Sequence, residues 1–323
     1  MQFRPFPPLS TRVSVIGFGT WAMGGESTLG GKQLGWGQTD RPEAERAVRR
    51  AVAGGINFYD TADIYGNGTS ESLLGEWLHQ DKDVLICTKF GNREDASGRV
   101  VQDFGAAWLT ASVESSLRRL RRERLDVFLL HSPPDDFDWS QYDPAPLLAL
   151  RDQGKIGCFG VSCRSVKGAQ NVLRSRFGSV LELIYNALDR RAAETVLPEA
   201  SRAGYAVVAR VPLASGFLAG QYDENPASFS ATDYRSTLAP AEVQWRARSS
   251  RGLSFLADLP GGMAVSALRF SLSAPEIATV IPGMRRCAHV EKNLLASEHG
   301  PLDPASLKLI QEAVPHVYKG WEV

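Results

Sequence analysis

The feature that most constrains this chain is an alternation of short apolar runs with longer segments whose apolar residues recur at helical spacing. Most of the runs are continuously apolar rather than alternating, which indicates strands buried on both faces, as in a parallel sheet. Eight such strand–helix cycles fit a chain of 323 residues and predict an α/β fold, a (β/α)8 TIM barrel. The expected strands lie at residues 15–19, 56–59, 84–88, 126–130, 156–161, 181–184, 205–209 and 278–281.

Helix signals separate these strands. Asp40 can cap a helix that has Pro42 in its first turn and Glu43 three residues after the cap. We expect a single barrel domain over residues 1–323. Outside the repeated cycles we expect an N-terminal hairpin at residues 2–13 and extra helices, at residues 240–258 and 303–314, before and after the last strand–helix units.

A doubly wound sheet is the alternative, and its usual marker is a Gly-x-Gly-x-x-Gly turn after the first strand. The chain has Gly17-Phe18-Gly19-Thr20-Trp21-Ala22-Met23-Gly24 there, so the glycine spacing is wrong and Trp21 stands where the helix should begin. Gly30-Gly31-Lys32-Gln33 lacks the spacing and the Ser or Thr of a P-loop. The glycine-rich loop up to Asp40 is too long for a plain connector, which makes it a candidate substrate loop.

The charge balance argues against several classes of function. The 36 Lys and Arg residues match 36 Asp and Glu residues, and zero net charge disfavours nucleic-acid binding and a polybasic membrane anchor. No apolar run approaches the roughly 20 residues of a transmembrane helix, and the N-terminus has no secretory signal. We therefore expect a cytoplasmic protein whose four scattered cysteines are free thiols. Its isolated histidines predict no metal site.

Four polar side chains stand at the ends of three consecutive expected strands. Asp60 follows the second strand with Tyr65 in the adjoining loop, Lys89 follows the third strand, and His131 follows the fourth. Each residue alone is more commonly a structural polar group, but the C-terminal ends of barrel strands are where reactive groups collect. A lysine ammonium lowers the pKa of a nearby phenol from about 10. Tyr65 could then protonate a carbonyl oxygen, with His131 directed at the same atom, while hydride must come from a cofactor.

The segment Asn57-Phe58-Tyr59-Asp60-Thr61-Ala62-Asp63-Ile64-Tyr65-Gly66 resembles the signature of the aldo-keto reductases. The resemblance covers nearly the whole chain. It implies a bacterial-type NADP(H)-dependent oxidoreductase that interconverts an aldehyde, ketone or sugar carbonyl and the alcohol, with Asp60, Tyr65, Lys89 and His131 as its catalytic tetrad. Further matching segments, in the right order, are Gly17 to Trp21, Ser70 to Gly75, Leu129 to Pro133, Gly157 to Ser162, Tyr185-Asn186, Pro212 to Gly216, and Ile281-Pro282-Gly283 with Asn293.

The resemblance also implies that a nicotinamide dinucleotide lies across the barrel mouth. Cys163 and Glu182 stand where the family usually has Asn and Gln for the carboxamide, and Arg210 stands where many members stack a Tyr on the nicotinamide. Arg210 could stack there too, or it could pair with a carboxylate such as Glu182. The implied cofactor-binding residues are Gly19, Thr20, Trp21, Asp60, Ser162, Cys163, Glu182, Arg210, Val211, Pro212, Leu213, Ala214, Ser215, Gly216, Ile281, Gly283, Arg285, Arg286, His289 and Asn293.

Two arginines suggest which dinucleotide is bound. Arg285 and Arg286 precede an expected helix at residues 286–296, where cations are unfavourable unless an anion is bound. We interpret them as a clamp for the 2′-phosphate of NADP(H), with NAD(H) and a plain surface arginine pair as the alternatives.

The substrate and the function class are less constrained. Trp21, Trp36, Ile64 and Phe90 are expected to line an aromatic mouth for a small carbonyl or alcohol. Two other functions stay open: a cofactor-sensing binding subunit with slow turnover, and a Schiff-base enzyme with Lys89 as nucleophile. Asp60 as an ionic partner of Lys89 argues against the second. The sequence predicts no oligomeric state.

Overall fold

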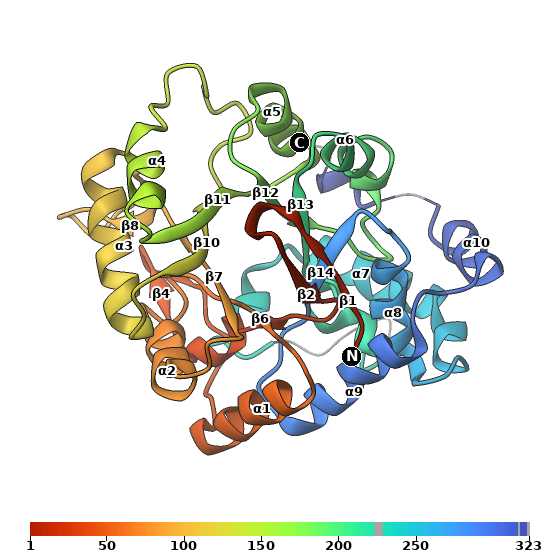
Figure 1. Cartoon of the computed structure of the whole chain (residues 1–323). Helices are drawn as coiled ribbons and strands as arrows, with labels where there is room; N and C mark the ends of the chain where they lie inside the picture. The colour runs from red at the N-terminus through yellow and green to blue at the C-terminus, as the bar shows by residue number, and fades with distance from the viewer. Residues whose placement is uncertain (223–228, 316, 322–323) are drawn as a thin grey trace.

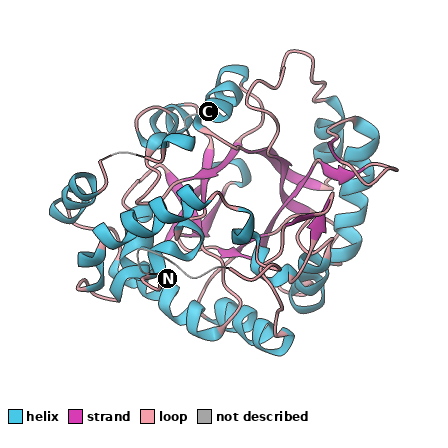
Figure 2. Cartoon of the chain, turned by 180° about the vertical axis from the view of Figure 1, so that it is seen from behind, coloured by secondary structure: helices cyan, strands magenta, loops and turns pink. Residues whose placement is uncertain are grey.

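The computed structural model describes residues 1–222, 229–315 and 317–321. Its centre is an eight-stranded parallel sheet that curls into a barrel, with the helices around it (Figures 1 and 2). The predicted TIM barrel is therefore confirmed. In the order in which they neighbour one another, the strands are β14 (Ile277–Ile281), β13 (Ala206–Arg210), β12 (Val180–Ile184), β11 (Ile156–Ser162), β10 (Leu125–His131), β7 (Leu85–Phe90), β6 (Phe58–Asp60) and β3 (Phe18–Gly19).

The barrel closes through a short seam between its first and last strands. The N–H of Gly17 donates to the carbonyl of Val280 at 2.8 Å, and the N–H of Val280 donates to the carbonyl of Val15 at 3.0 Å. The first strand is shorter than the expected 15–19 because the residues before Phe18 pair only through isolated bridges. A Cβ at Gly19 would lie 3.0 Å from the carbonyl oxygen of Pro282, so glycine at this position favours the close approach of the two edges.

Helices follow most of the strands and pack around the barrel. The first begins as predicted, with Asp40 Oδ1 accepting the N–H of Glu43 at 3.1 Å. The helices are α1 (Arg41–Ala53), α2 (Thr69–Leu78), α3 (Ala106–Leu120), α4 (Ala145–Asp152), α5 (Val166–Ser175), α6 (Val196–Arg202), α7 (Pro240–Gly252), α8 (Gly262–Leu272), α9 (Cys287–His299) and α10 (Pro304–Ala313).

An antiparallel hairpin of β1 (Phe3–Phe6) and β2 (Thr11–Ser14) lies across one end of the barrel (Figure 1). Asn57 Oδ1, just before β6, accepts the N–H of Ser14 at 2.7 Å, which places the hairpin at the amino ends of the strands. Phe6 and Val13 are fully buried in the apolar cluster inside the barrel. The predicted hairpin thus blocks this end, and the open mouth is the carboxyl end of the strands.

Two regions differ from the expected pattern. The helix expected at 240–258 divides into α7 and a 3-10 turn, η6 (Ser254–Ala257), with Leu253 fully buried at the break. Two small hairpins were not predicted because their strands are too short and too polar to alternate visibly. They are β4 (Thr28–Leu29) with β5 (Lys32–Gln33), and β8 (Asn92–Glu94) with β9 (Val100–Gln102).

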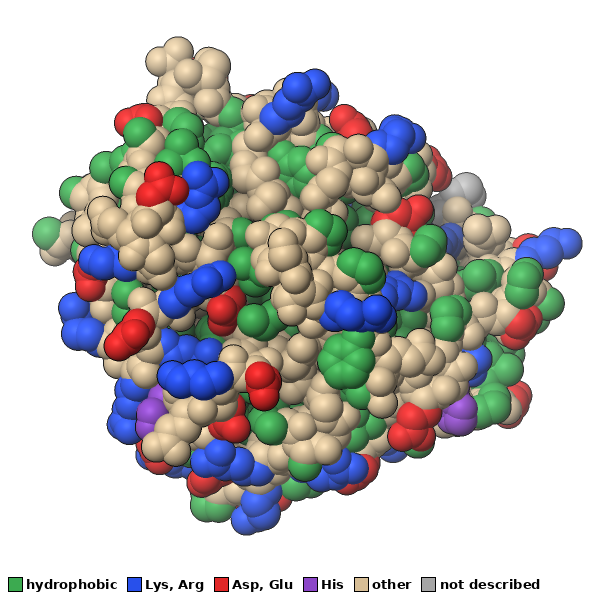
Figure 3. Space-filling model, in the orientation of Figure 1, with side chains coloured by type: hydrophobic (Ala, Val, Ile, Leu, Met, Phe, Trp, Pro, Cys, Tyr) green, Lys and Arg blue, Asp and Glu red, His purple; other side chains and the backbone are tan. Residues whose placement is uncertain are grey.

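The surface agrees with the balanced composition. On the face shown in Figure 3, Lys and Arg side chains are interspersed with Asp and Glu side chains. Within the described residues, every helix is too short or too polar to span a lipid bilayer.

Candidate active site

Lys89, the next-to-last residue of β7, lies at the centre of a buried polar cluster inside the barrel mouth. Its Nζ donates to Asp60 Oδ1 at 2.5 Å and to the carbonyl of Thr61 at 2.9 Å. Glu182 Oε2 lies 3.4 Å from the same nitrogen. The ligand atoms of Asp60, Cys87 and Glu182 lie within 4.8 Å of one another, and the ammonium of Lys89 supplies the positive charge among them.

Tyr65 and His131 lie beside this cluster. The Nζ of Lys89 is 5.2 Å from the centre of the Tyr65 ring, and the rings of Tyr65 and His131 are 5.9 Å apart, edge to face. The loop carrying Tyr65 packs tightly on the turn η2 (Trp21–Gly24): a Cβ at Gly66, where φ is 61°, would lie 2.2 Å from the carbonyl oxygen of Gly24. The structure thus brings together all four residues of the expected tetrad.

Burial governs the protonation of these groups. It raises the pKa of Tyr65 above the ordinary value, and the ammonium of Lys89 opposes this rise without cancelling it. The expectation of a lowered Tyr65 pKa is therefore wrong in its net direction, because desolvation of the phenolate outweighs the attraction of the lysine. Burial would lower the pKa of Lys89, but Asp60 and Glu182 raise it well above the usual value. Burial and the charge of Lys89 hold the pKa of His131 well below its usual value, which leaves its imidazole neutral.

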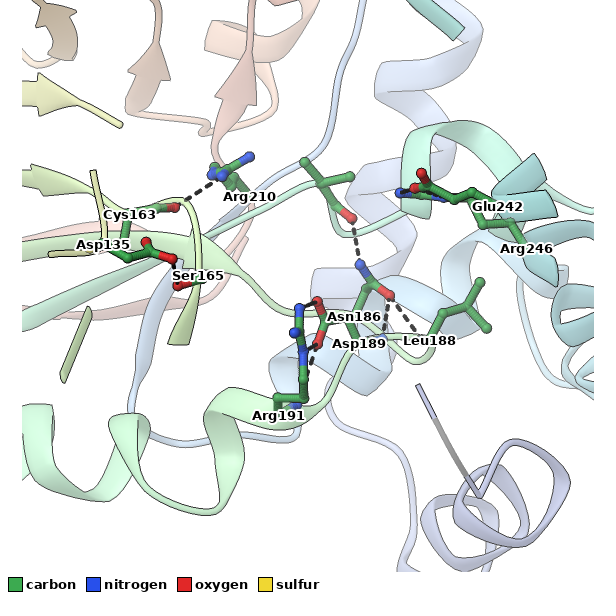
Figure 4. A network of polar contacts seen from close by, with 11 residues as sticks. Asp135, Cys163, Ser165, Asn186, Leu188, Asp189, Arg191, Arg210, Glu242 and Arg246 are labelled. Carbon is green, nitrogen blue, oxygen red and sulfur yellow. Dashed lines mark hydrogen bonds and ion pairs between the residues drawn. The ribbon is translucent and has the colours of Figure 1, made fainter. Parts of the chain in front are cut away.

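The positions where the chain departs from the resembled family lie together. Ser162 Oγ donates to Glu182 Oε1 at 2.9 Å. Arg210 donates to the carbonyl of Cys163 at 3.0 Å (Figure 4). Cys163 itself belongs to the hydrophobic core. Arg210 Nε is 4.0 Å from Glu182 Oε1, so the alternative of an Arg210–Glu182 pair holds. Glu182 Oε2 and Arg210 Nε are buried and have no hydrogen-bond partner among the described residues, as expected of atoms that meet a polar ligand.

The segment after β13, residues 211–216, has an unusual backbone. Val211, Ala214 and Ser215 have positive φ angles of 54°, 48° and 62°, and Gly216 has 91°. Each non-glycine residue in such a conformation costs about 1 to 3 kcal/mol, and these residues concentrate at ligand sites. Asn186 Nδ2 donates to the carbonyl of Val211 at 3.0 Å and holds the start of this turn (Figure 4). Successive N–H groups in turns of this kind form anion-binding concavities, which suits a pyrophosphate.

Positive charges gather at the start of α9. Arg285 Nη1 donates to the carbonyls of Trp36 at 3.0 Å and Gln38 at 3.2 Å, so Arg285 also fixes the glycine-rich loop. Arg286 is exposed at the N-cap of the helix. Burial first, and then the neighbouring arginines, lower the pKa of His289. Cations that repel one another at a helix N-terminus form a site for an anion.

A carboxylate also lies at this helix start. Glu43 Oε1 accepts the N–H of Cys287 at 2.8 Å, and Glu43 is paired with Arg46 at 2.7 Å. Glu43 therefore caps α9 from α1, which the capping pattern at Asp40 did not reveal. Asn293, expected to meet the adenine, is 3% exposed on the same helix.

An aromatic cluster of Trp21, Trp36 and Tyr234 covers one side of the mouth. The ring centres of Trp21 and Trp36 are 5.4 Å apart, and that of Tyr234 lies 4.6 Å from Trp21 and 4.7 Å from Trp36. Trp21 also stacks on Tyr65 at 5.9 Å. The two expected tryptophans thus lie beside the tetrad. Trp21 precedes the β4–β5 hairpin of the glycine-rich loop, and Trp36 follows it.

The other two expected substrate residues lie elsewhere. Phe90 is 0% exposed and stacks on Phe128 at 4.8 Å in the core, so the prediction that Phe90 lines the mouth is wrong. Ile64 lines a pocket of about 230 Å³ together with Asp63 and Ser112, between the Tyr65 loop and α3.

The sequence patterns did not predict two residues of the mouth, Tyr234 and Arg235. The hydroxyl of Tyr234 bonds to Ser215, and the guanidinium of Arg235 lies 5.0 Å from the centre of the Trp36 ring. Arg235 is paired with Asp233 at 2.6 Å. Their segment has no periodic pattern, and its only sequence signal was the length of the connection that contains it.

Comparisons with known proteins agree with this geometry. Residues 15–315 match the model of the Aldo/keto reductase family. A curated relative, a probable voltage-gated potassium channel subunit beta from Arabidopsis thaliana, is 26% identical over 97% of this chain and 97% of its own. The solved aldo-keto reductase AKR11C1 from Bacillus halodurans, in its holo form, is 25% identical with a TM-score of 0.80 over 100% of both chains. The glycerol dehydrogenase AKR11B4 from Gluconobacter oxydans is 26% identical with a TM-score of 0.79, over 98% of this chain and 97% of that one.

Proposed function

Because the chain belongs to the aldo/keto reductase family, we propose that it catalyses NADPH-dependent reduction of an aldehyde, ketone or sugar carbonyl to the alcohol, or the reverse reaction. The observation that carries this proposal is the convergence of Asp60, Lys89, Tyr65 and His131 at the open end of a barrel whose other end is blocked. A proton donor, a charged group that tunes it and a neutral hydrogen-bonding imidazole are what protonation of a carbonyl oxygen requires.

Tyr65 is the general acid in this scheme. Its hydroxyl donates a proton to the carbonyl oxygen, and Lys89, 5.2 Å from the ring centre, stabilises the phenolate that remains. Asp60 fixes Lys89 through their 2.5 Å contact. The neutral His131 orients the substrate through the same oxygen. A bound nicotinamide supplies the hydride that adds to the carbonyl carbon, so one hydride and one proton convert C=O to CH–OH.

The chain's own residues fit the cofactor. Arg210 Nε, which is buried without a hydrogen-bond partner among the described residues, suits the polar carboxamide of a nicotinamide. The left-handed turn at 211–216 suits a pyrophosphate. Arg285 and Arg286 at α9 support NADP(H) over NAD(H) through a charge-assisted contact to the 2′-phosphate. Fluorescence titration with both dinucleotides tests this choice, and equal affinities would contradict it.

The central test is single turnover of NADPH with a panel of aldehydes and ketones. Tyr65→Phe should lower the rate of hydride transfer by at least about 100-fold, while NADPH still quenches the protein fluorescence. Tyr205→Phe is the matched control, because Tyr205 lies before β13 at the opposite end of the barrel and its hydroxyl donates to the carbonyl of Phe177 at 3.2 Å. Unchanged turnover in Tyr65→Phe would refute the assignment.

The second candidate function is a cofactor-sensing role, which the similarity to a probable channel subunit favours. It predicts NADPH binding without multiple turnovers across the whole carbonyl panel. Sustained turnover with any substrate of the panel would exclude that role as the main function.

A further inference from the structure

A second carboxylate reaches the catalytic lysine. Glu182 lies in the middle of β12 and is 1% exposed. Its Oε2 is 3.4 Å from Lys89 Nζ, and its Oε1 accepts the Ser162 hydroxyl at 2.9 Å. Arg210 Nε lies 4.0 Å from the same Oε1. Glu182 therefore stands between two cations, Lys89 and Arg210, one on each of its oxygens.

The charged groups around the Tyr65 phenol form a single chain. Asp60, Lys89, Glu182 and Arg210 follow one another through contacts of 2.5, 3.4 and 4.0 Å. Asp63, in the loop after β6, interacts electrostatically with Lys89, and Arg164, after β11, interacts with His131. Three other titratable groups face this chain: His131 on β10, Cys87 on β7 and Cys163 after β11. All three are neutral, because burial lowers the pKa of the histidine and raises the pKa values of the thiols. The chain balances two negative charges against two positive ones, and the phenol lies next to the lysine.

We propose that Glu182 is a positioning residue that shares the Lys89 ammonium with Asp60, keeps the Tyr65 hydroxyl protonated into alkaline solution, and so favours carbonyl reduction over alcohol oxidation. This inference rests on the proposed function, since it concerns the direction in which that site works best.

The physical reasoning is electrostatic. A buried ammonium favours the phenolate next to it, whereas a buried carboxylate disfavours the phenolate. Glu182 partly cancels the field of Lys89 at the phenol without displacing the lysine, because Asp60 still holds it at 2.5 Å. Carbonyl reduction needs the protonated phenol, and alcohol oxidation needs the phenolate. Raising the pKa of the phenol therefore extends the pH range of carbonyl reduction upward and shifts alcohol oxidation to higher pH.

The experiment is the pH dependence of kcat in both directions for the wild type and three variants. In the wild type, the fall of reduction and the rise of oxidation should both have their midpoint above pH ~10, the usual value for tyrosine. In Glu182→Gln, which keeps the shape and can still accept from Ser162, both midpoints should move down by roughly one pH unit. Glu182→Asp, which keeps the charge, should move them less than Glu182→Gln does. Glu114→Gln, at an exposed pair with Lys155, should leave them unchanged.

The outcomes separate the readings. A Glu182→Gln profile that overlays the wild type, whatever its kcat, makes Glu182 merely structural and overturns the proposal. If Glu182→Gln does not fold, Glu182→Asp decides, because its shorter carboxylate stands farther from Lys89: midpoints below those of the wild type support the proposal, and unchanged midpoints overturn it. If no carbonyl is reduced at all, the proposed function fails. The ultraviolet titration of Tyr65 then still tests Glu182, taken as the difference between each protein and its Tyr65→Phe derivative.

Discussion

Replacing Lys89 by methionine should reveal how strongly the buried charges depend on their central cation. The side chain of Lys89 is fully buried, and those of Asp60 and Glu182 are 4% and 2% exposed. Methionine preserves most of the volume but leaves two buried carboxylates with no cation between them. Breaking a buried ion pair from one side costs about 3 to 5 kcal/mol. We expect a loss of that size in the free energy of unfolding at pH 8.

The same variant should show a diagnostic pH dependence. Burial and Glu182 already raise the pKa of Asp60 in the wild type, against the opposing pull of Lys89. Without Lys89, the folded-state pKa of Asp60 rises further above its unfolded value of about 4. Groups raised in this way bind protons in the folded state, so their stability is fully present below pH ~4 and is lost as pH rises, by about 1.4 kcal/mol per pH unit for each group. The deficit of Lys89→Met against the wild type should therefore at least halve at pH 5.5.

Urea unfolding followed by circular dichroism at both pH values measures this deficit, provided that the m-values of variant and wild type agree. Lys155→Met is the matched control: Lys155 is 37% exposed and pairs with Glu114 at the surface, where such pairs contribute about 0 to 1 kcal/mol. A Lys89→Met deficit below about 1 kcal/mol at pH 8, or one that is equal at the two pH values, would refute the reasoning.

Three further outcomes follow from the site. Arg286→Ala should raise the KM for NADPH about tenfold and leave the KM for NADH unchanged, and Glu43→Ala should lower the KM for NADPH. High salt should reduce the effect of each substitution. Initial rates with the two dinucleotides measure these KM values, and an equal change for NADPH and NADH would contradict the reasoning. Because the pKa of His131 is held well below its usual value, the rate of reduction should show no titration between pH 6 and 8, and a step in that range would mean that the imidazole ionises there. Gly66→Ala should reduce single-turnover hydride transfer by more than about tenfold, because its Cβ would clash with Gly24 and displace the Tyr65 loop; an unchanged rate would show that the two turns can separate without cost.

The sequence predicted the barrel and the proximity of Asp60, Lys89 and His131 because both depend on local patterns, and the resemblance to a known family added Tyr65 to this set. Continuous apolar runs indicate parallel strands, and the residue at the end of each run marks the mouth. Asp60 and His131 end their strands as expected, and Lys89 is one residue from the end of its strand. Chain order and strand ends were sufficient to bring these residues together.

Contacts across the barrel could not be predicted in this way. Lys89 on β7 and Glu182 on β12 belong to strands that are not neighbours, and only the closed cylinder brings their side chains together. The prediction of a lowered Tyr65 pKa was wrong for a related reason, since the burial of the phenol depends on all the segments around the mouth. The error at Phe90 was avoidable: successive side chains of a strand point to opposite faces, so an inward Lys89 turns Phe90 outward toward the helices.

The strained turn after β13 has a consequence for affinity. Valine at position 211 is a costly choice for a left-handed backbone, and a glycine there would relax it. Because the rest of the structure holds this turn in its strained conformation, the turn loses little conformational entropy when a ligand binds. Val211→Gly should therefore raise the free energy of unfolding and also raise the dissociation constant of the dinucleotide, because the relaxed turn is less rigid before binding.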